Sequence, residues 1–80
     1  MKITYDPRYN IAYIRFKEKI GTVETIKLSE EMIVDMTPDG TVYGIELLNA
    51  NQQLRQDNGG RVSFLNEATG KHDEIDLEVA

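Results

Sequence analysis

Residues 32–48, MIVDMTPDGTVYGIELL, decide the fold. Two runs rich in apolar and β-branched residues, 32–37 and 41–48, flank Pro38-Asp39-Gly40, and Asp-Gly between such runs is a strong hairpin signal. With Asp39-Gly40 as a two-residue type I′ loop, one face of the hairpin is expected to carry the pairs Met36–Tyr43, Val34–Ile45 and Met32–Leu47. The other face then carries the pairs Asp35–Gly44 and Ile33–Glu46, so its two carboxylates are diagonal neighbours.

A second hairpin is expected before this stretch. Residues 1–5 alternate apolar and polar, residues 6–10 (DPRYN) supply turn chemistry, and residues 11–17 resume as a strand. The favoured register places six side chains on one face, in the pairs Met1–Phe16, Ile3–Ile14 and Tyr5–Ala12. Ile11 and Tyr13 fall on the opposite face, which indicates that this face is also partly covered. Residues 22–28 are expected to form a further strand.

The C-terminal part is predicted to contain a short helix and a last hairpin. Residues 51–56 have good helix propensity, and Asn58-Gly59-Gly60 is suited to end a helix or form a turn. Residues 61–66 and 73–80 form the hairpin around residues 67–71, with Ile75, Leu77 and Val79 inward and Glu74, Asp76 and Glu78 outward. The predicted fold class is mainly β, bordering on α+β: an antiparallel, twisted β-meander of five to seven strands with one short helix.

The length allows one domain over residues 1–80, divided into a meander core at 1–50, a short helix or linker at 51–60 and a hairpin at 61–80. The formal net charge of −5 argues against nucleic acid or an anionic membrane as a partner. The chain has no Cys and only His72, so we expect no cofactor and no Cys- or His-based metal site. No run of 18 apolar residues and no signal-peptide pattern is present, which predicts a cytoplasmic protein without a membrane span.

The small size of the chain predicts self-association. A compact 9.1 kDa protein has an accessible surface of about 4,900 Å² and buries little more than 60% of what its unfolded chain exposes. With no disulfide to add stability, the chain is expected to bury further surface against another chain. We therefore expect a homodimer, a complex with another protein, or both.

Two sets of side chains are candidates for a functional site. Asp35 and Glu46 could act as a carboxylate pair in acid–base chemistry or bind a hard cation, although a polar position on the outer face of a strand needs no function. Among the tyrosines, Tyr5 and Tyr43 are expected in the core. Tyr9 and Tyr13, together with Ile11, are the candidates for a protein interface.

A set of short motifs resembles a known family. They are Tyr5-Asp6-Pro7, Ala12-Tyr13-Ile14-Arg15-Phe16, Val34-Asp35-Met36, Asp39-Gly40, Val42 and Gly44-Ile45-Glu46-Leu47-Leu48-Asn49-Ala50. Over roughly residues 1–50 the chain resembles domain of unknown function 2283, a family of small prokaryotic proteins. Asn10 departs from the family pattern, which tends to have an acid there. The resemblance implies a compact β-meander that ends in a short helix, and it implies no established activity.

These observations give two hypotheses for function. The first is a non-enzymatic protein-interaction module. The resemblance adds an antitoxin-like role with a small basic protein as partner, because some family members are thought to be encoded beside small toxin-like proteins. The alternative is a small carboxylate-dependent hydrolase or a divalent-metal-binding domain that uses Asp35 and Glu46.

Overall fold

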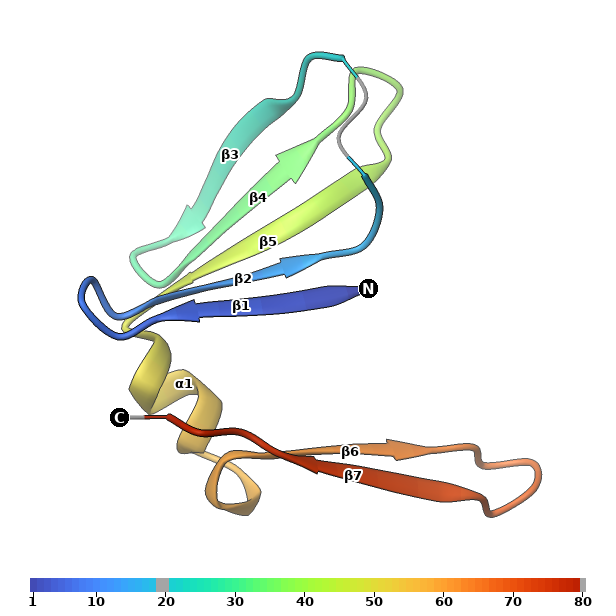
Figure 1. Cartoon of the computed structure of the whole chain (residues 1–80). Helices are drawn as coiled ribbons and strands as arrows, with labels where there is room; N and C mark the ends of the chain where they lie inside the picture. The colour runs from blue at the N-terminus through green and yellow to red at the C-terminus, as the bar shows by residue number, and fades with distance from the viewer. Residues whose placement is uncertain (19–20, 80) are drawn as a thin grey trace.

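Seven strands and one short α-helix make up residues 1–18 and 21–79, the part of the chain that the computed structural model describes. The elements are β1 (Lys2–Asp6), β2 (Ile11–Arg15), β3 (Glu24–Ser29), β4 (Met32–Met36), β5 (Val42–Leu48), α1 (Ala50–Arg55), the 3₁₀ helix η1 (Asn58–Gly60), β6 (Arg61–Leu65) and β7 (His72–Asp76). Five strands form one antiparallel sheet and β6 pairs with β7 in a second (Figure 1). The predicted mainly-β fold is confirmed.

The large sheet is meander-like, with one departure from chain order. Its strand order is β1-β2-β5-β4-β3, so β5 returns to pair with β2. The predicted partners Ile3–Ile14 and Tyr5–Ala12 are confirmed in the first hairpin. On the other side of β2, Ala12 faces Leu47. The β2–β5 pairing joins the two hairpins and places their apolar residues on one face.

The turn between β4 and β5 differs from the predicted two-residue loop. The Thr37 amide donates to the Thr41 carbonyl over 2.8 Å, so Pro38, Asp39 and Gly40 form a three-residue loop. A two-residue loop would require an N–H at position 38, and proline has none. Hydrogen bonds from Thr37 and Thr41 lower the pKa of Asp39 in this loop to about 2.

A β-bulge then restores the predicted register. Next to the loop Met36 faces Val42, so the predicted Met36–Tyr43 pair is wrong, and Tyr43 is the extra residue. Beyond the bulge four predicted pairs are confirmed: Asp35–Gly44, Val34–Ile45, Ile33–Glu46 and Met32–Leu47. The bulge places the Tyr43 ring beside Tyr13, with 6.2 Å between centroids, rather than in the core.

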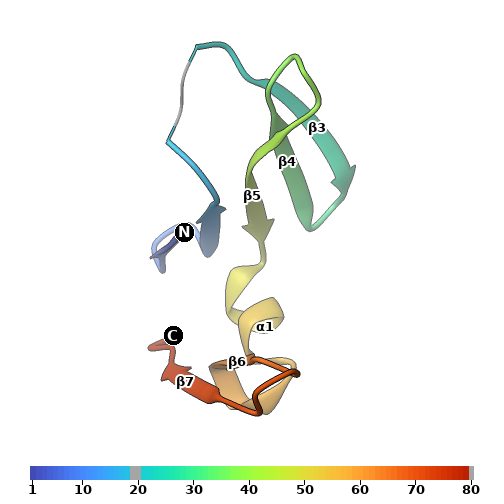
Figure 2. The ribbon, with the colours of Figure 1, turned by 90° about the vertical axis from the view of Figure 1, so that its right-hand side faces the viewer.

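The hydrophobic core is small and lies where α1 meets the sheet. Among the described residues four hydrophobic side chains are buried: Ala12, Val34, Leu47 and Ala50. Three of these, Ala12, Leu47 and Ala50, form one cluster, and five partly buried side chains pack against it: Tyr5, Ile14, Met32, Ile45 and Leu54. Figure 2 shows α1 leading away from the end of β5, so it covers only that end of the sheet.

The C-terminal hairpin, β6–β7, is an arm that lies below the sheet (Figures 1 and 2). Its second strand ends at Asp76, whereas the sequence predicted a strand over 73–80. The prediction that Ile75 points into a core is wrong, because its side chain is 63% exposed. Within residues 1–18 and 21–79 the two strands of the arm pair with each other alone and add no strand to the large sheet, which explains this exposure.

Asn10 in the β1–β2 turn holds the start of α1. Its side-chain oxygen accepts a hydrogen bond from the Asn51 amide over 2.8 Å, and its carbonyl accepts one from the Ala50 amide over 3.0 Å. Asn10 has a φ of 56°, in the left-handed region that asparagine tolerates better than most residues. Asn49, which precedes the helix, makes no side-chain capping bond. A residue 40 positions before the first residue of the helix therefore caps it.

Substituting Asn10 should destabilise the whole fold. Asn10→Ala removes the remote cap and places alanine in a left-handed conformation, so we expect a loss of about 2 kcal/mol in the free energy of unfolding. Urea unfolding followed by circular dichroism measures this loss. Asn10→Asp, which keeps the accepting oxygen, should lose less, and equal losses for the two variants would contradict the capping role.

Candidate functional site

One side-chain network crosses the outer face of the large sheet. The Tyr13 hydroxyl, from β2, donates to Asp35 Oδ2 on β4 over 2.7 Å. The Thr25 hydroxyl, from the edge strand β3, donates to Asp35 Oδ1 over 2.8 Å. Both carboxylate oxygens of Asp35 are therefore bonded within the protein. The network links three strands, and it passes over β5 without a side chain from that strand.

Gly44 lets the Tyr13 side chain cross β5. A Cβ atom at position 44 would lie 2.5 Å from the Tyr13 hydroxyl oxygen and 2.6 Å from Cε1 of the same ring. Gly44 faces Asp35 on one side and Arg15 on the other, so it lies directly beneath the path from Tyr13 to Asp35. The glycine is needed here for close approach of a ring to the backbone, which explains its presence inside a strand.

The electrostatics of this network keep Tyr13 protonated. Burial raises the pKa of the Tyr13 phenol, and the hydrogen bond to the Asp35 carboxylate and the charge of that carboxylate raise it further. A neutral phenol is the donor that an ionised carboxylate needs. The pair thus acts as a fixed donor and acceptor, which suits a structural tie.

The structure places the two candidate carboxylates as the sequence predicted but adds no further ligand. Asp35 and Glu46 are diagonal neighbours, because Asp35 faces Gly44 and Glu46 faces Ile33 and Tyr13. Within the described residues no group of three or more His, Cys, Asp or Glu side chains could hold a metal ion. With both oxygens of Asp35 already bonded, this geometry favours a structural role for Asp35.

The three candidate interface residues lie at two different places. Tyr9 is 72% exposed in the β1–β2 turn, where the Arg8 guanidinium lies 5.7 Å from its ring centroid. Arg8 also bonds both oxygens of Asp6 and lowers the pKa of that carboxyl. Ile11 and Tyr13 share the outer face of β2 and are half-buried. The role of Tyr13 in the strand network was not predicted.

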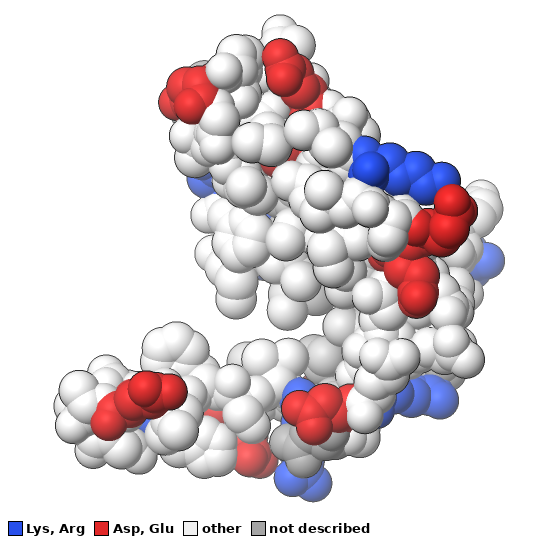
Figure 3. Space-filling view, turned by 180° about the vertical axis from the view of Figure 1, so that it is seen from behind, with Lys and Arg blue, Asp and Glu red and all other residues white. Residues whose placement is uncertain are grey.

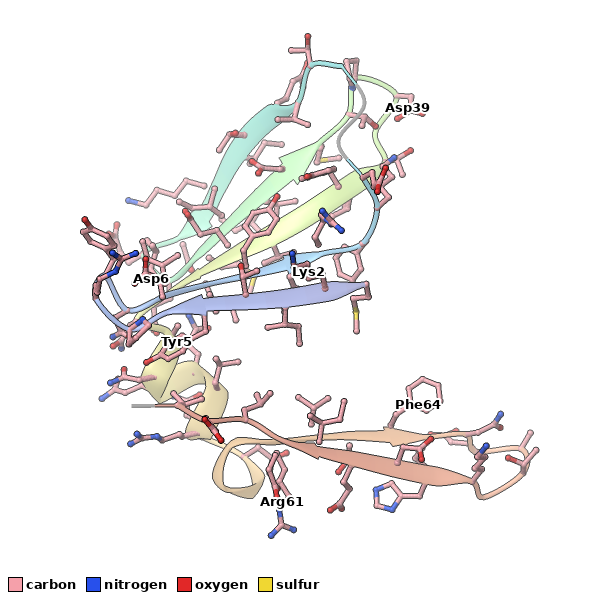
Figure 4. All side chains as sticks on the ribbon, viewed as in Figure 1. Lys2, Tyr5, Asp6, Asp39, Arg61 and Phe64 are labelled. Atoms are coloured by element: carbon pink, nitrogen blue, oxygen red, sulfur yellow. The ribbon has the colours of Figure 1, made fainter. Side chains whose placement is uncertain are left out.

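An apolar groove between the sheet and the arm is the second candidate site, and sequence reasoning missed it. Its volume is about 290 Å³, and it is lined by Met1, Ile3, Val62, Ile75 and Leu77. Figure 4 shows Phe64 pointing from the arm toward the sheet and Arg61 pointing away from it. Seen from behind, a hollow separates sheet and arm, and the sheet surface above it is largely uncharged (Figure 3).

The two faces of the arm differ in chemistry. Val62, Phe64 and Ile75 share the face toward the groove with one charged residue, Asp73, which faces Phe64. On the opposite face Arg61 forms ion pairs with Glu74 and Asp76, at 3.5 and 3.0 Å. The alternation that predicted an inward and an outward face is thus present, but the apolar face looks into an open groove.

A further hollow, of about 350 Å³, lies against the polar side of α1. Asn51, Gln52, Arg55 and Gln56 line it, all from one short segment. It brings together no carboxylate or nucleophile, so it supplies no site for chemistry.

Gly44→Ala should break the strand network. The added methyl group must displace the Tyr13 ring, so we expect a loss of about 1–3 kcal/mol in the free energy of unfolding. In a Tyr13→Ala protein, which lacks the ring, adding Gly44→Ala should cost much less free energy of unfolding. Urea unfolding of the four proteins of this cycle measures the coupling, and additive losses would contradict it.

The Tyr13 pKa predicts a stability loss in alkali. Because the folded state raises this pKa above its ordinary value of 10.0, the stabilisation is complete below about pH 10 and declines as the pH rises toward the folded pKa. Urea unfolding at a series of pH values from neutral to strongly alkaline should show this decline. Tyr13→Phe should weaken it, and Asp35→Asn, which removes the charge beside Tyr13, should move ionisation of the phenol to lower pH. An identical pH dependence in Tyr13→Phe would contradict the assignment.

The comparisons with known proteins identify a family and little else. The family model described as "Protein of unknown function (DUF2283)" matches residues 2–51, which span β1–β5 and the first residues of α1. The arm lies outside the match. No curated protein and no solved structure matches the chain. Among the described residues no helix has the length and apolar character needed to cross a membrane.

Proposed function

The chain belongs to the DUF2283 family, whose function is unknown, so we propose from the geometry that it is a non-enzymatic protein-interaction module that docks its partner in the apolar groove. The observation that carries this proposal is the groove itself, because all five of its lining side chains are apolar. Exposed apolar surface of this kind marks interaction sites in small soluble proteins.

Exposed side chains beside the groove extend the docking surface. Phe64 is 68% exposed on the groove face of the arm, and Met1 is 83% exposed at the start of the chain. Large apolar side chains that contact water gain most when a partner covers them, at about 25 cal/mol per Å². Aromatic residues such as Phe64 are also enriched at interfaces. A partner that fills the groove would therefore cover these side chains together.

The hydrogen bonds of Asp35 on the outer sheet face also support an interaction module rather than an enzyme or a metal-binding domain. Asp35, the best-placed carboxylate, spends both oxygens on Tyr13 and Thr25. A general acid or base needs a hydrogen-bonding site left for its substrate. This arrangement favours interaction over hydrolysis or metal binding as the function.

The partner in an antitoxin-like role would be a small basic protein. The net charge of −5 favours a cationic partner, and β7 contributes Asp73 on the groove face of the arm and Glu74 and Asp76 on the opposite face. Such a partner would place an apolar ridge in the groove and basic residues around it. Charges at the rim then act on the rate of association and on the choice of partner.

Substitution in the groove should abolish partner binding while a matched change on the other face of the arm should not. Ile75→Ser removes an apolar side chain from the groove, and Leu65→Ser removes one of similar exposure, 57% against 63%, from the opposite face. We expect a protein captured from the native host by the wild type and by Leu65→Ser to be lost with Ile75→Ser. Capture that is equal with both variants would refute the groove as the docking site.

The salt dependence of capture tests whether the partner is a basic protein. A small basic protein should be captured at low salt and released in part at moderate salt, because ions screen exposed charges. Circular dichroism of each variant checks that the sheet is intact.

A further inference from the structure

We propose that the groove is filled by a second copy of this chain: two chains clasp one another about a two-fold axis, the apolar face of each arm packing against the sheet of the other. This inference rests on the proposed function, since it concerns the same groove, and it makes a second copy of the chain the occupant in place of a small basic protein. The arm, β6–β7, is outside the family match, so the dimer is a property of this chain rather than of the matched segment.

The surface area of the chain carries the inference. Its accessible surface is 6017 Å². A compact monomer of this mass exposes about 4,900 Å², so the chain exposes about 1,100 Å² too much. A standard protein interface buries about 800 Å² on each partner. The excess accessible surface is therefore enough for one stable interface, and in a single copy this surface is exposed to water.

The position of the arm explains where the excess arises. The shape of the chain is open, with a radius of gyration of 14.1 Å and extents of 36 × 34 × 20 Å along its principal axes. About 12 Å is expected for a compact chain of this length. The arm stands apart from the sheet along most of its length, as Figures 1 and 3 show. Closing this hollow against a second copy would remove both the arm face and the sheet face from water.

The chemistry of the two surfaces favours a copy of the same chain. The groove has no charged lining residue, and the surface that would enter it must also be apolar. The arm offers such a surface in Val62, Phe64 and Ile75. Of its charged residues, Asp73 lies on this same face, opposite Phe64, whereas Arg61 and Glu74 lie on the other face. In a two-fold arrangement one patch meets its own copy, so each chain covers the exposed surface of the other.

The first test is the mass of the purified chain in solution. Light scattering after gel filtration, over a wide concentration range, should give twice the chain mass of 9.1 kDa. The double variant Phe64→Ser with Ile75→Ser should give the single mass, and Leu65→Ser on the polar face should stay dimeric. A wild type that is monomeric at every concentration, or a dimer that survives the double variant, would overturn the proposal.

The second test asks whether the arm of one chain reaches the sheet of the other. The chain has no cysteine, so an Ile3→Cys protein and an Ile75→Cys protein with different tags can be mixed and oxidised. Each chain then has one thiol, and any disulfide joins two chains. A mixed disulfide should form in high yield. Ser63→Cys, on the polar face of β6, replaces Ile75→Cys in the control and should give little. Equal yields would overturn the arm-to-sheet contact.

The two proposals fail in different ways. If the chain is monomeric but a captured protein is still lost with Ile75→Ser, the interaction module stands and the second copy is refuted. If the chain is monomeric and no captured protein depends on Ile75, both are refuted.

Discussion

The hydrogen bond from Tyr13 to Asp35 across Gly44 is the interaction on which the large sheet depends. It connects β2 to β4 over the top of β5, and Thr25 extends it to β3. For the phenol to reach the carboxylate, β5 must lie between the two strands and must present a residue without a Cβ at the crossing. The network therefore requires that β5 pair with β2, which is the one departure from a meander.

Because of this constraint, the outer face of the sheet joins strands, and the apolar face and the arm are available to a partner. The outer sheet face contains the two candidate carboxylates, Asp35 and Glu46, and the network uses Asp35 to join strands. The opposite face contains the apolar residues, and α1 covers only one end of it. What is left available for a partner is thus the remainder of the apolar face and the arm below it. Gly44 and Asp35, which hold the sheet together, lie inside the matched segment, whereas the groove combines Ile3 from that segment with Val62, Ile75 and Leu77 from beyond it.

The sequence predicted the strands and most of the pairing because alternation has a strict period of two. Four of five pairs in the central hairpin follow from it, since a slip of one residue would place Val34 and Ile45 in water. The prediction of a two-residue loop was wrong because it rested on Asp39-Gly40 alone, and such a loop needs an N–H at position 38 that proline lacks. The side-chain network could not be predicted from pairing alone, because Tyr13 and Asp35 lie on strands that do not touch. Gly44 inside a strand was the available signal, since a glycine there indicates a close approach.

The arm shows most clearly what a pattern can and cannot specify. Alternation in residues 61–65 and 72–76 separates a mainly apolar face from a mainly charged one, with Asp73 and Leu65 as the exceptions. It carries no information on which surface covers the apolar face, and the assumption that the same chain would do so gave the wrong prediction for Ile75. A hairpin of two strands is marginal on its own. In the described part of the chain this one has neither a third strand nor a helix on its apolar face, so the surface of the proposed partner would supply the support that the hairpin lacks. Folding of the arm and association are therefore expected to be coupled: loss of the partner surface should destabilise β6–β7 before it affects the sheet that Tyr13 and Asp35 hold together.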